Sequence, residues 1–472
     1  MSATTTTLTN NPPAYLLTTA ALQLLFGKFY TFFSIKWVFL IAIALFEIGS
    51  LICGVANNSV TLIIGRAVSG LGSAGIFSGA LIILAYSVPL NRRPAFTGMI
   101  GSMYGIASVA GPLLGGVFTD KVTWRWCFYI NLPIGAITIF VIALFFPDPQ
   151  RKTVKDEPWS VRIWQFDPIG TSLFMPAIIC LLLALQWGGT TYAWSNGRII
   201  ALFVLFGVLI SAFLFVQYKQ QDHATVPPRI IKKRTVWASA VFAFATGAAF
   251  LASVYYLPIW FQAVKGASAV SSGLMNLPML ISVVVMSLVA GAAVTVWGYY
   301  TPFMIAGTVA MSIGFGLIST FKPDTGSPTW IGFQVLAGAG VGLGMQQPLM
   351  AVQTVLDMKD VPTGTSVIVF MQTLGGALFV SIAQNVFTNK LVAYILEYVP
   401  GLDPMVVFHT GATSIQTSIP AAMLPGVTLA YSNALTKTFL VSASLAAVTI
   451  VGSSFVEWKS VKGKNIEAGG MA

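Results

Sequence analysis

The sequence is poor in charge, cysteine and histidine. Only 8% of its 472 residues are Asp, Glu, Lys or Arg, whereas globular proteins carry roughly 25% charged residues. So few charges cannot cover the water-facing surface of a soluble protein of this size. With three cysteines, two histidines and no cluster of them along the chain, we expect neither a disulfide framework nor a metal site.

Hydrophobic residues make up 56% of the chain, and they come in blocks of about twenty, the length of a helix that crosses a bilayer. The blocks do not alternate between polar and apolar residues, as the strands of a membrane barrel would. The sequence therefore predicts an all-α polytopic membrane protein with about thirteen spans: 14–33, 37–56, 61–86, 97–118, 126–146, 168–187, 198–217, 236–260, 273–297, 300–320, 330–355, 363–387 and 434–456.

The net charge is +11, which in a soluble protein would suggest a nucleic-acid partner. With thirteen spans, however, most lysines and arginines fall on the side that carries the C-terminus. This is the bias of cytoplasmic loops, so we expect a cytoplasmic C-terminus, an external N-terminus and no nucleic acid.

The loops divide the chain into five regions. We expect a disordered polar tail over 1–13, an N-terminal helical bundle over 14–147, and an inserted helix hairpin with flanking cytoplasmic loops over 148–235. A C-terminal bundle follows over 236–456, with an external loop over 388–433, and a cytoplasmic tail over 457–472. Within that loop, Pro420 and Pro425 bracket too few apolar residues for a span.

Small residues dominate the stretch from Gly98 to Gly116, which reads GMIGSMYGIASVAGPLLGG. Such spacing lets helix backbones approach closely in lipid, and Pro112 permits a kink. We predict helix packing at Gly98, Gly111, Pro112, Gly115 and Gly116, in an interface that can rock or in one that is only tightly packed.

Two charges lie inside predicted spans, where each costs roughly 2.5–3.5 kcal/mol on insertion scales. Arg66 is a candidate switch that pairs with an acidic group or with substrate; the alternative is a structural arginine bonded to carbonyls or reaching the interface. Glu47, the one carboxylate deep in a span, is a candidate proton carrier that either pairs with Arg66 or is protonated and hydrogen-bonded.

Amides in the later spans are candidates for a substrate cavity or for ordinary bonds between helices. The cavity candidates are Asn276, Gln346, Gln347 and Gln372; Gln262, Gln384 and Asn385 share the same two readings. Gln346 and Gln347 precede Pro348 at the end of GAGVGLGMQQP, an arrangement typical of broken helices near the middle of transporters.

Four stretches resemble the major facilitator superfamily, in its fourteen-helix drug/proton antiporter branch, and in particular toxin efflux pumps of filamentous fungi. They are GPLLGG (Gly111 to Gly116), IIGRAVSGLGSAG (Ile63 to Gly75), GKFYTFFSIKW (Gly27 to Trp37) and WRWCFYINLPIG (Trp124 to Gly135). The third is similar to the family's gating loop and implies that Gly27, Lys28 and Lys36 belong to it. Thr31 and Ser34 depart from the loop's usual acidic residue and glycine.

The resemblance implies two bundles plus an inserted helix pair, and proton-coupled export of hydrophobic small molecules by alternating access. It also implies that the family's first helix has no counterpart here, so a truncated, non-transporting membrane protein is the alternative; a nutrient importer of the same fold is a third. We expect no enzyme activity and no cofactor. We also expect no ATP site, because no phosphate-binding loop occurs in the sequence. The expected partners are the bilayer, a small substrate and protons, for a monomer in the plasma membrane or the vacuolar membrane.

Overall fold

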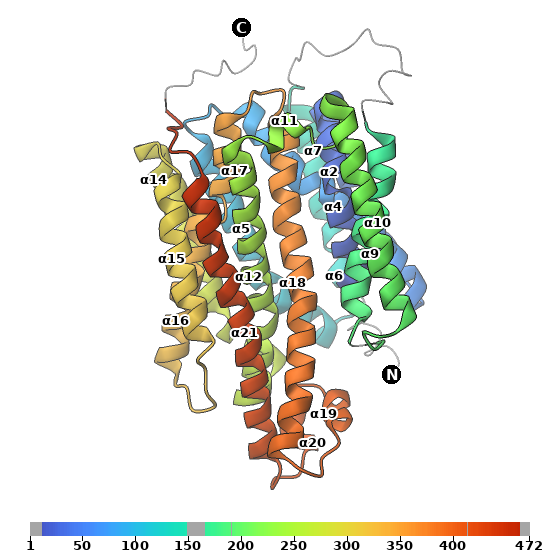
Figure 1. The fold of residues 1–472 in the computed structure, drawn as a ribbon, viewed down its shortest axis with the longest axis vertical. Coiled ribbons are helices and arrows are strands. Elements are labelled where there is room, and N and C mark those ends of the chain that lie inside the picture. Colours follow the sequence, from blue (N-terminus) through green and yellow to red (C-terminus); the bar gives the residue numbers. More distant parts are fainter. Residues whose placement is uncertain (1–11, 149–165, 190, 413, 463–472) are drawn as a thin grey trace.

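The computed structural model describes residues 12–148, 166–189, 191–412 and 414–462. Within these ranges the chain forms helices and no strand, apart from two isolated β-bridges. The long helices stand side by side along one common direction (Figure 1). Eleven segments of the described chain are helical, long and apolar enough to cross a bilayer. The fold is that of an all-α polytopic membrane protein.

Each predicted span corresponds to one long helix or to two short helices in line. Two of these helices are not among the eleven: α2 (Pro12–Phe32) and α5 (Arg93–Lys121). Threonines and Lys28 lower the hydropathy of α2, and six glycines lower that of α5. Both nevertheless lie alongside the other long helices (Figure 1).

The N-terminal group consists of α2, α3 (Ile35–Gly54), α4 (Ser59–Ser87), α5, α6 (Trp126–Tyr129) and α7 (Asn131–Phe145). Asn58 caps α4, since its side-chain oxygen accepts the Thr61 N–H at 2.8 Å. The backbones of α3 and α4 approach closely, because a Cβ on Gly65 would lie only 2.9 Å from the Cys53 backbone nitrogen. By contrast, only 6% of the α6–α7 segment is buried, so most of it is available to lipid.

An inserted hairpin of α9 (Pro168–Trp187) and α10 (Gly197–Gln220) follows. The short helices η1 (Gln221–His223) and α11 (Pro228–Ile231) connect it to the C-terminal group. Asp167 caps α9 with a fully buried carboxylate. It accepts the Gly170 N–H at 2.6 Å, the Thr225 N–H and hydroxyl at 2.9 and 2.7 Å, and the Gln217 amide. One carboxylate therefore joins the start of α9 to the end of α10 and to the segment after it.

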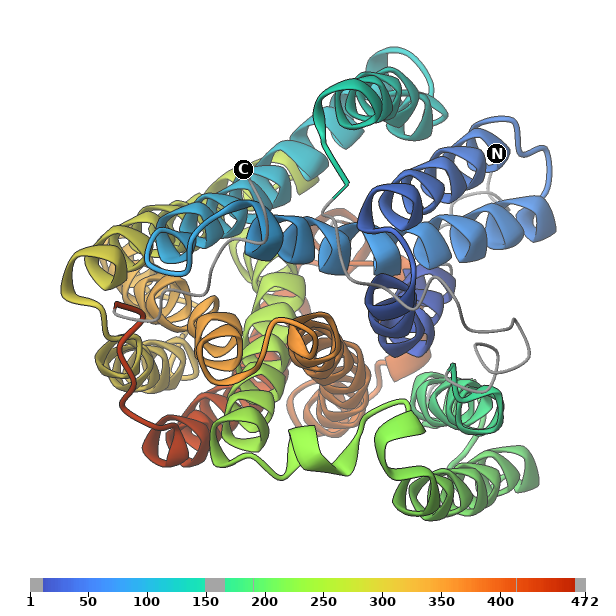
Figure 2. The same cartoon turned by 90° about the horizontal axis from the view of Figure 1, so that it is seen from above.

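The C-terminal group contains the remaining helices: α12 (Arg234–Lys265), α13 (Ala269–Met275), α14 (Leu277–Trp297), α15 (Thr301–Ile318), α16 (Ser327–Gly344), α17 (Gln347–Val355), α18 (Val361–Tyr398), α19 (Pro404–Thr410), α20 (Ile415–Ser418) and α21 (Leu424–Phe455). The two groups meet where α5 packs on α14 and where α2 packs on α18. Figure 2 shows the hairpin at the edge of the assembly, and α9 contacts both α2 and α18.

The predicted loop over 388–433 is shorter in the structure than expected. Helix α18 continues to Tyr398 and α21 already begins at Leu424. Leu391 and Ile395 keep the helical spacing and are fully buried, which extends α18. Pro425 lies in the first turn of α21, where a proline is tolerated, so it starts a helix. Only the segment between them, with α19 and α20, is loop-like.

The ends of the described helices define two faces. Lys28, near the end of α2, contacts the segment after α10, and Arg234, at the start of α12, contacts Phe455 at the end of α21. We call this side, with residues 87–92, 221–233 and 356–360, the basic face. Helix α2 therefore starts on the opposite face from the one on which α21 ends (Figure 1). Most of the predicted tails, 1–11 and 463–472, and most of the first predicted loop, 149–165, lie outside the described residues.

Candidate functional site

The two helix groups are tied together at the basic face. The Tyr86 hydroxyl of α4 donates to the Met358 carbonyl at 2.8 Å, and the Thr31 and Thr363 hydroxyls lie 3.4 Å apart. Gly27 permits this approach of α2 to α18, because a Cβ there would lie 2.7 Å from the Ser366 side chain. Polar contacts of this kind keep the two groups closed on this side.

The predicted gating-loop residues divide between two places. Gly27 and Lys28 lie at the junction of the groups, where the Lys28 ammonium donates to the His223 carbonyl at 3.2 Å and is 3% exposed. Lys36 lies within the N-terminal group and donates to the Ala143 carbonyl at 2.7 Å. The structure therefore brings only the first two to the contact between groups.

An ion-pair cluster that the sequence analysis did not identify completes this face. Arg229 of α11 makes two hydrogen bonds to Asp360 at 2.5 and 2.7 Å, and a third to Asp222 at 2.6 Å. The Asp360 side chain is only 7% exposed, whereas that of Arg229 is 43% exposed. The bonds to Asp360, more than those to Asp222, raise the pKa of the Arg229 guanidinium above its ordinary value.

Lys28, the segment after α10 and Arg229 thus form one chain of contacts across the basic face. Lys28 holds His223 from the N-terminal group, and Arg229 holds Asp360 at the start of α18. Lys233 adds a bond to the Val355 carbonyl at 3.3 Å. We call residues 221–233 with these partners the latch.

The two candidate proton-coupling residues do not meet. Arg66 of α4 stacks over the ring of Tyr15 at 4.6 Å, and the described residues place no carboxylate in ion-pair contact with it. Glu47 of α3 points at α7, where a Cβ on Gly135 would overlap its carboxylate, and its Oε2 has no hydrogen-bond partner in the described chain. The suggested Arg66–Glu47 pair is absent from the described part of the structure.

The glycine motif on α5 has two kinds of surroundings. A Cβ on Gly98 would lie 2.6 Å from the Ser287 carbonyl of α14, so the backbones touch between the two helix groups. A Cβ on Gly111 would meet no described atom within 4 Å, and at Gly115 and Gly116 the nearest described atoms would be 4.0 and 3.8 Å away. Pro112 lies within α5. Tight packing thus occurs at the start of the motif and open space at its end.

The candidate cavity amides lie at three separate junctions. Gln346 occupies the break between α16 and α17 and is 5% exposed. Its Nε2 lies close against Gly101 of α5, and its Oε1 has no hydrogen-bond partner among the described residues. Gln347 follows it at the start of α17. Gln372 lies against Gly247 of α12. Asn276 lies at the turn between α13 and α14.

Three further amides make bonds to other residues of the C-terminal group or to the hairpin. Gln384 accepts the Tyr256 hydroxyl at 2.8 Å, and Gln262 donates to the Ser272 hydroxyl at 2.8 Å. Asn385 donates to the Leu185 carbonyl at 3.2 Å. Among the described residues, Gln346 is the one of the seven amides that contacts the other helix group.

Two helical groups in one membrane protein, touching along α2–α18 and α5–α14 and closed on one face by polar contacts, define a secondary transporter that can alternate between two openings. Residues 4–380 match the Major Facilitator Superfamily, and the chain belongs to this superfamily.

Curated relatives cover nearly the whole chain. It is similar to the MFS-type efflux pump MFS1 of Arthroderma benhamiae, with 61% identity over 454 residues, 96% of this chain and 85% of the relative. It is also similar to the aspyridones efflux protein of Neocamarosporium betae, with 54% identity over 96% of this chain and 81% of the relative. The chain is also similar to the efflux pump aflT of Aspergillus parasiticus, with 49% identity over 95% of this chain and 88% of the relative.

Solved structures share the fold at low identity. The proton:xylose symporter XylE gives a TM-score of 0.60 at 13% identity, over 98% of this chain and 88% of that one. The human organic anion transporter MFSD10 gives a TM-score of 0.58 at 13% identity, over 93% of this chain and 83% of that one. At this identity the likeness extends to the arrangement of helices alone.

Proposed function

We propose that this protein exports hydrophobic small molecules, such as secondary metabolites or toxins, by alternating access driven by inward proton flow. The observation that carries the proposal is 49–61% identity, over 95% or more of this chain, to proteins named as efflux pumps. The plasma membrane is the proposed location, and a monomer the proposed working unit.

The closed basic face gives the proposal a physical form. Opening toward the cytoplasm requires the latch and the Thr31–Thr363 contact, at the basic-face ends of α2 and α18, to separate. The α5–α14 contact and the rest of the α2–α18 contact act as the surfaces on which the groups rock. A proton or a substrate drives this change only if it binds one state better than the other. Arg66 is the proposed switch because it is a charge within a span that stacks on Tyr15 of another helix.

Glu47 is the proposed proton carrier. Its carboxylate lies between α3 and α7 with an oxygen that lacks a hydrogen-bond partner among the described residues. An isolated buried carboxylate is stabilised by taking up a proton. Protonation would therefore change the packing of α3 against α7.

The test measures accumulation of a hydrophobic fluorescent dye, rhodamine 6G, in yeast cells that express the chain. We expect less dye to accumulate than in cells that lack the protein, and an uncoupler of the proton gradient should remove the difference. Arg66→Ala should abolish efflux, whereas Arg92→Ala, an exposed arginine at the basic face, should leave it intact. Equal accumulation with and without the protein, at matched expression and across a panel of hydrophobic compounds, would reject export and favour a non-transporting protein.

A further inference from the structure

A buried apolar cluster joins the two helix groups near the basic face. Leu81 and Ala85 of α4 belong to it together with Leu349 and Met350 of α17, and each of the four is at most 1% exposed. The Met350 sulfur also lies 3.8 Å from the buried Thr97 hydroxyl of α5. Helix α17 therefore packs against the N-terminal group, and we call these five residues the seal.

Gln353 lies at the seal without a hydrogen-bond partner. It follows Leu349 by four residues and Met350 by three, so it shares their face of α17. Its side chain is fully buried, and neither its Nε2 nor its Oε1 has a partner among the described residues. An amide offers two donor hydrogens and an acceptor oxygen, and within the described chain all of them are unused.

Two more polar side chains at the same junction lack a partner. Gln346, against Gly101 of α5, has the unpartnered Oε1 described above. Arg93 at the start of α5 is 3% exposed, and its Nη2 lies 3.8 Å from the sulfur of Met358, which follows α17. Its Nε donates to the Val88 carbonyl at 2.8 Å, but its Nη1 has no partner in the described chain. All three side chains lie where a helix of one group meets the other group.

These side chains and the latch act in opposite directions. A buried polar group without a partner is destabilising, and water supplies the missing bonds once the two groups separate. Each of the three side chains therefore favours the open basic face. The latch and the bond from the Tyr86 hydroxyl to the Met358 carbonyl favour the closed one. The balance between the two sets determines how often the face opens.

We propose that Gln353 opposes closure of the basic face, with Gln346 as a second residue of the same kind. The amide of Gln353 is hydrated while the face is open and loses those bonds when α17 meets α4 and α5. An apolar side chain at this position would stabilise the closed state and make opening rarer. The inference rests on the alternating access of the proposed function, because it concerns the change from the closed state to the open one.

The experiment uses the full chain in inside-out membrane vesicles, without substrate and without a proton gradient. It measures the rate at which a membrane-impermeant maleimide labels Ser366→Cys in a background without the three native cysteines. Residue 366 is 1% exposed and lies against Gly27 of α2, so it reacts only while the basic face is open. Gln353→Met keeps the length of the side chain without the amide and should slow labelling about tenfold, at an equal or higher melting temperature. Gln346→Met should also slow it.

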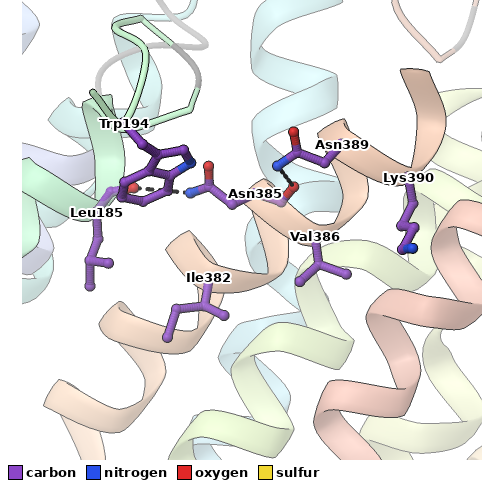
Figure 3. Close-up of a pocket in the computed structure, with 7 residues that line it drawn as sticks. All are labelled: Leu185, Trp194, Ile382, Asn385, Val386, Asn389 and Lys390. Carbon is purple, nitrogen blue, oxygen red and sulfur yellow. Dashed lines mark hydrogen bonds between the residues drawn. The ribbon is translucent and has the colours of Figure 1, made fainter. Parts of the chain in front are cut away.

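Asn385→Leu is the matched control. Asn385 is also a buried amide whose Oδ1 has no partner in the described chain. It lies on α18 and donates to the Leu185 carbonyl of the hairpin, away from the seal (Figure 3). Its replacement should change the labelling rate less than about twofold.

Three results would overturn the proposal. One is an unchanged labelling rate in Gln353→Met. Another is faster labelling with a lower melting temperature, because it would show that water or another group completes the bonds of this amide in the closed state. The third is equal slowing by Asn385→Leu. Since labelling is measured without substrate, a failure of dye export would reject the proposed function and leave this test unaffected.

Discussion

Removing Arg229 should open the basic face. Its guanidinium joins the segment after α10 to Asp360 at the start of α18, through two hydrogen bonds of 2.5 and 2.7 Å. In Arg229→Gln these charge-assisted bonds are lost, and the Asp360 carboxylate, only 7% exposed, loses its counterion. Because the proposed opening separates the latch, loss of this pair should disfavour the closed state.

The size of the effect follows from the exposure of the two side chains. Removing one partner of a buried pair costs about 3–5 kcal/mol, and an exposed pair contributes about 0.2–1 kcal/mol. Arg229 is 43% exposed, so solvent screens part of the loss, and we expect about 2 kcal/mol. That corresponds to a shift of about 30-fold in the equilibrium between closed and open.

The assay is the rate at which a membrane-impermeant maleimide labels Ser366→Cys in a background without Cys53, Cys127 and Cys180, using inside-out vesicles. Residue 366 is 1% exposed and lies under α2, so labelling reports opening of the basic face. We expect up to about 30-fold faster labelling in Arg229→Gln.

Asp222→Asn is the matched control. It removes the charge of the second partner of the same arginine, but the Asp222 side chain is 72% exposed, so labelling should change less than about twofold. Equal rates in wild type and Arg229→Gln, or equal effects of the Arg229 and Asp222 variants, would refute the reasoning.

Three other predictions concern stability, measured as the melting temperature in detergent. Gly49→Ala would press a Cβ into the backbone of α4 and should destabilise by about 1–3 kcal/mol, whereas Gly207→Ala, in open space within α10, should be neutral or stabilising by up to about 1 kcal/mol. Asp167→Asn places an amide nitrogen beside the groups that donate to Asp167 and should destabilise the fold by about 2 kcal/mol. An unchanged melting temperature would contradict the role of this helix cap. The ion pair with Lys459 at 2.5 Å is the main reason that the pKa of Glu457 lies below its ordinary 4.5. The stabilising contribution of Glu457 is therefore complete above pH 4.5 and is lost as the pH falls through the lowered pKa. Glu457→Gln should remove that acid-side loss, and an unchanged pH profile would contradict it.

The helices could be predicted because each uses a signal contained within about twenty residues. An apolar block is long enough to cross a bilayer or it is not, and Pro348 locates the break between α16 and α17. The predicted end of α18 at residue 387 is too early, because polar residues outside the hydrocarbon core lower the hydropathy without ending the helix. There the buried Leu391 and Ile395 carry the helical signal.

The contacts between helices could not be predicted in the same way. Arg229 and Asp360 are 131 positions apart, and no local pattern joins them. Glu47 and Arg66 lie on adjacent helices, yet the rotation of α3 aims the carboxylate at α7. Which side of a helix faces which neighbour depends on the packing of the whole assembly.

Helix α18 has 38 residues, and at 1.5 Å per residue it is about 57 Å long, nearly twice the roughly 30 Å hydrocarbon core. If it moves as a rigid rod pivoting at Asp360, a tilt of only about 10° would carry its far end through about 10 Å. A pair of spin labels at the far tips of α18 and α10 would turn a small rotation near the basic face into a displacement large enough to measure directly.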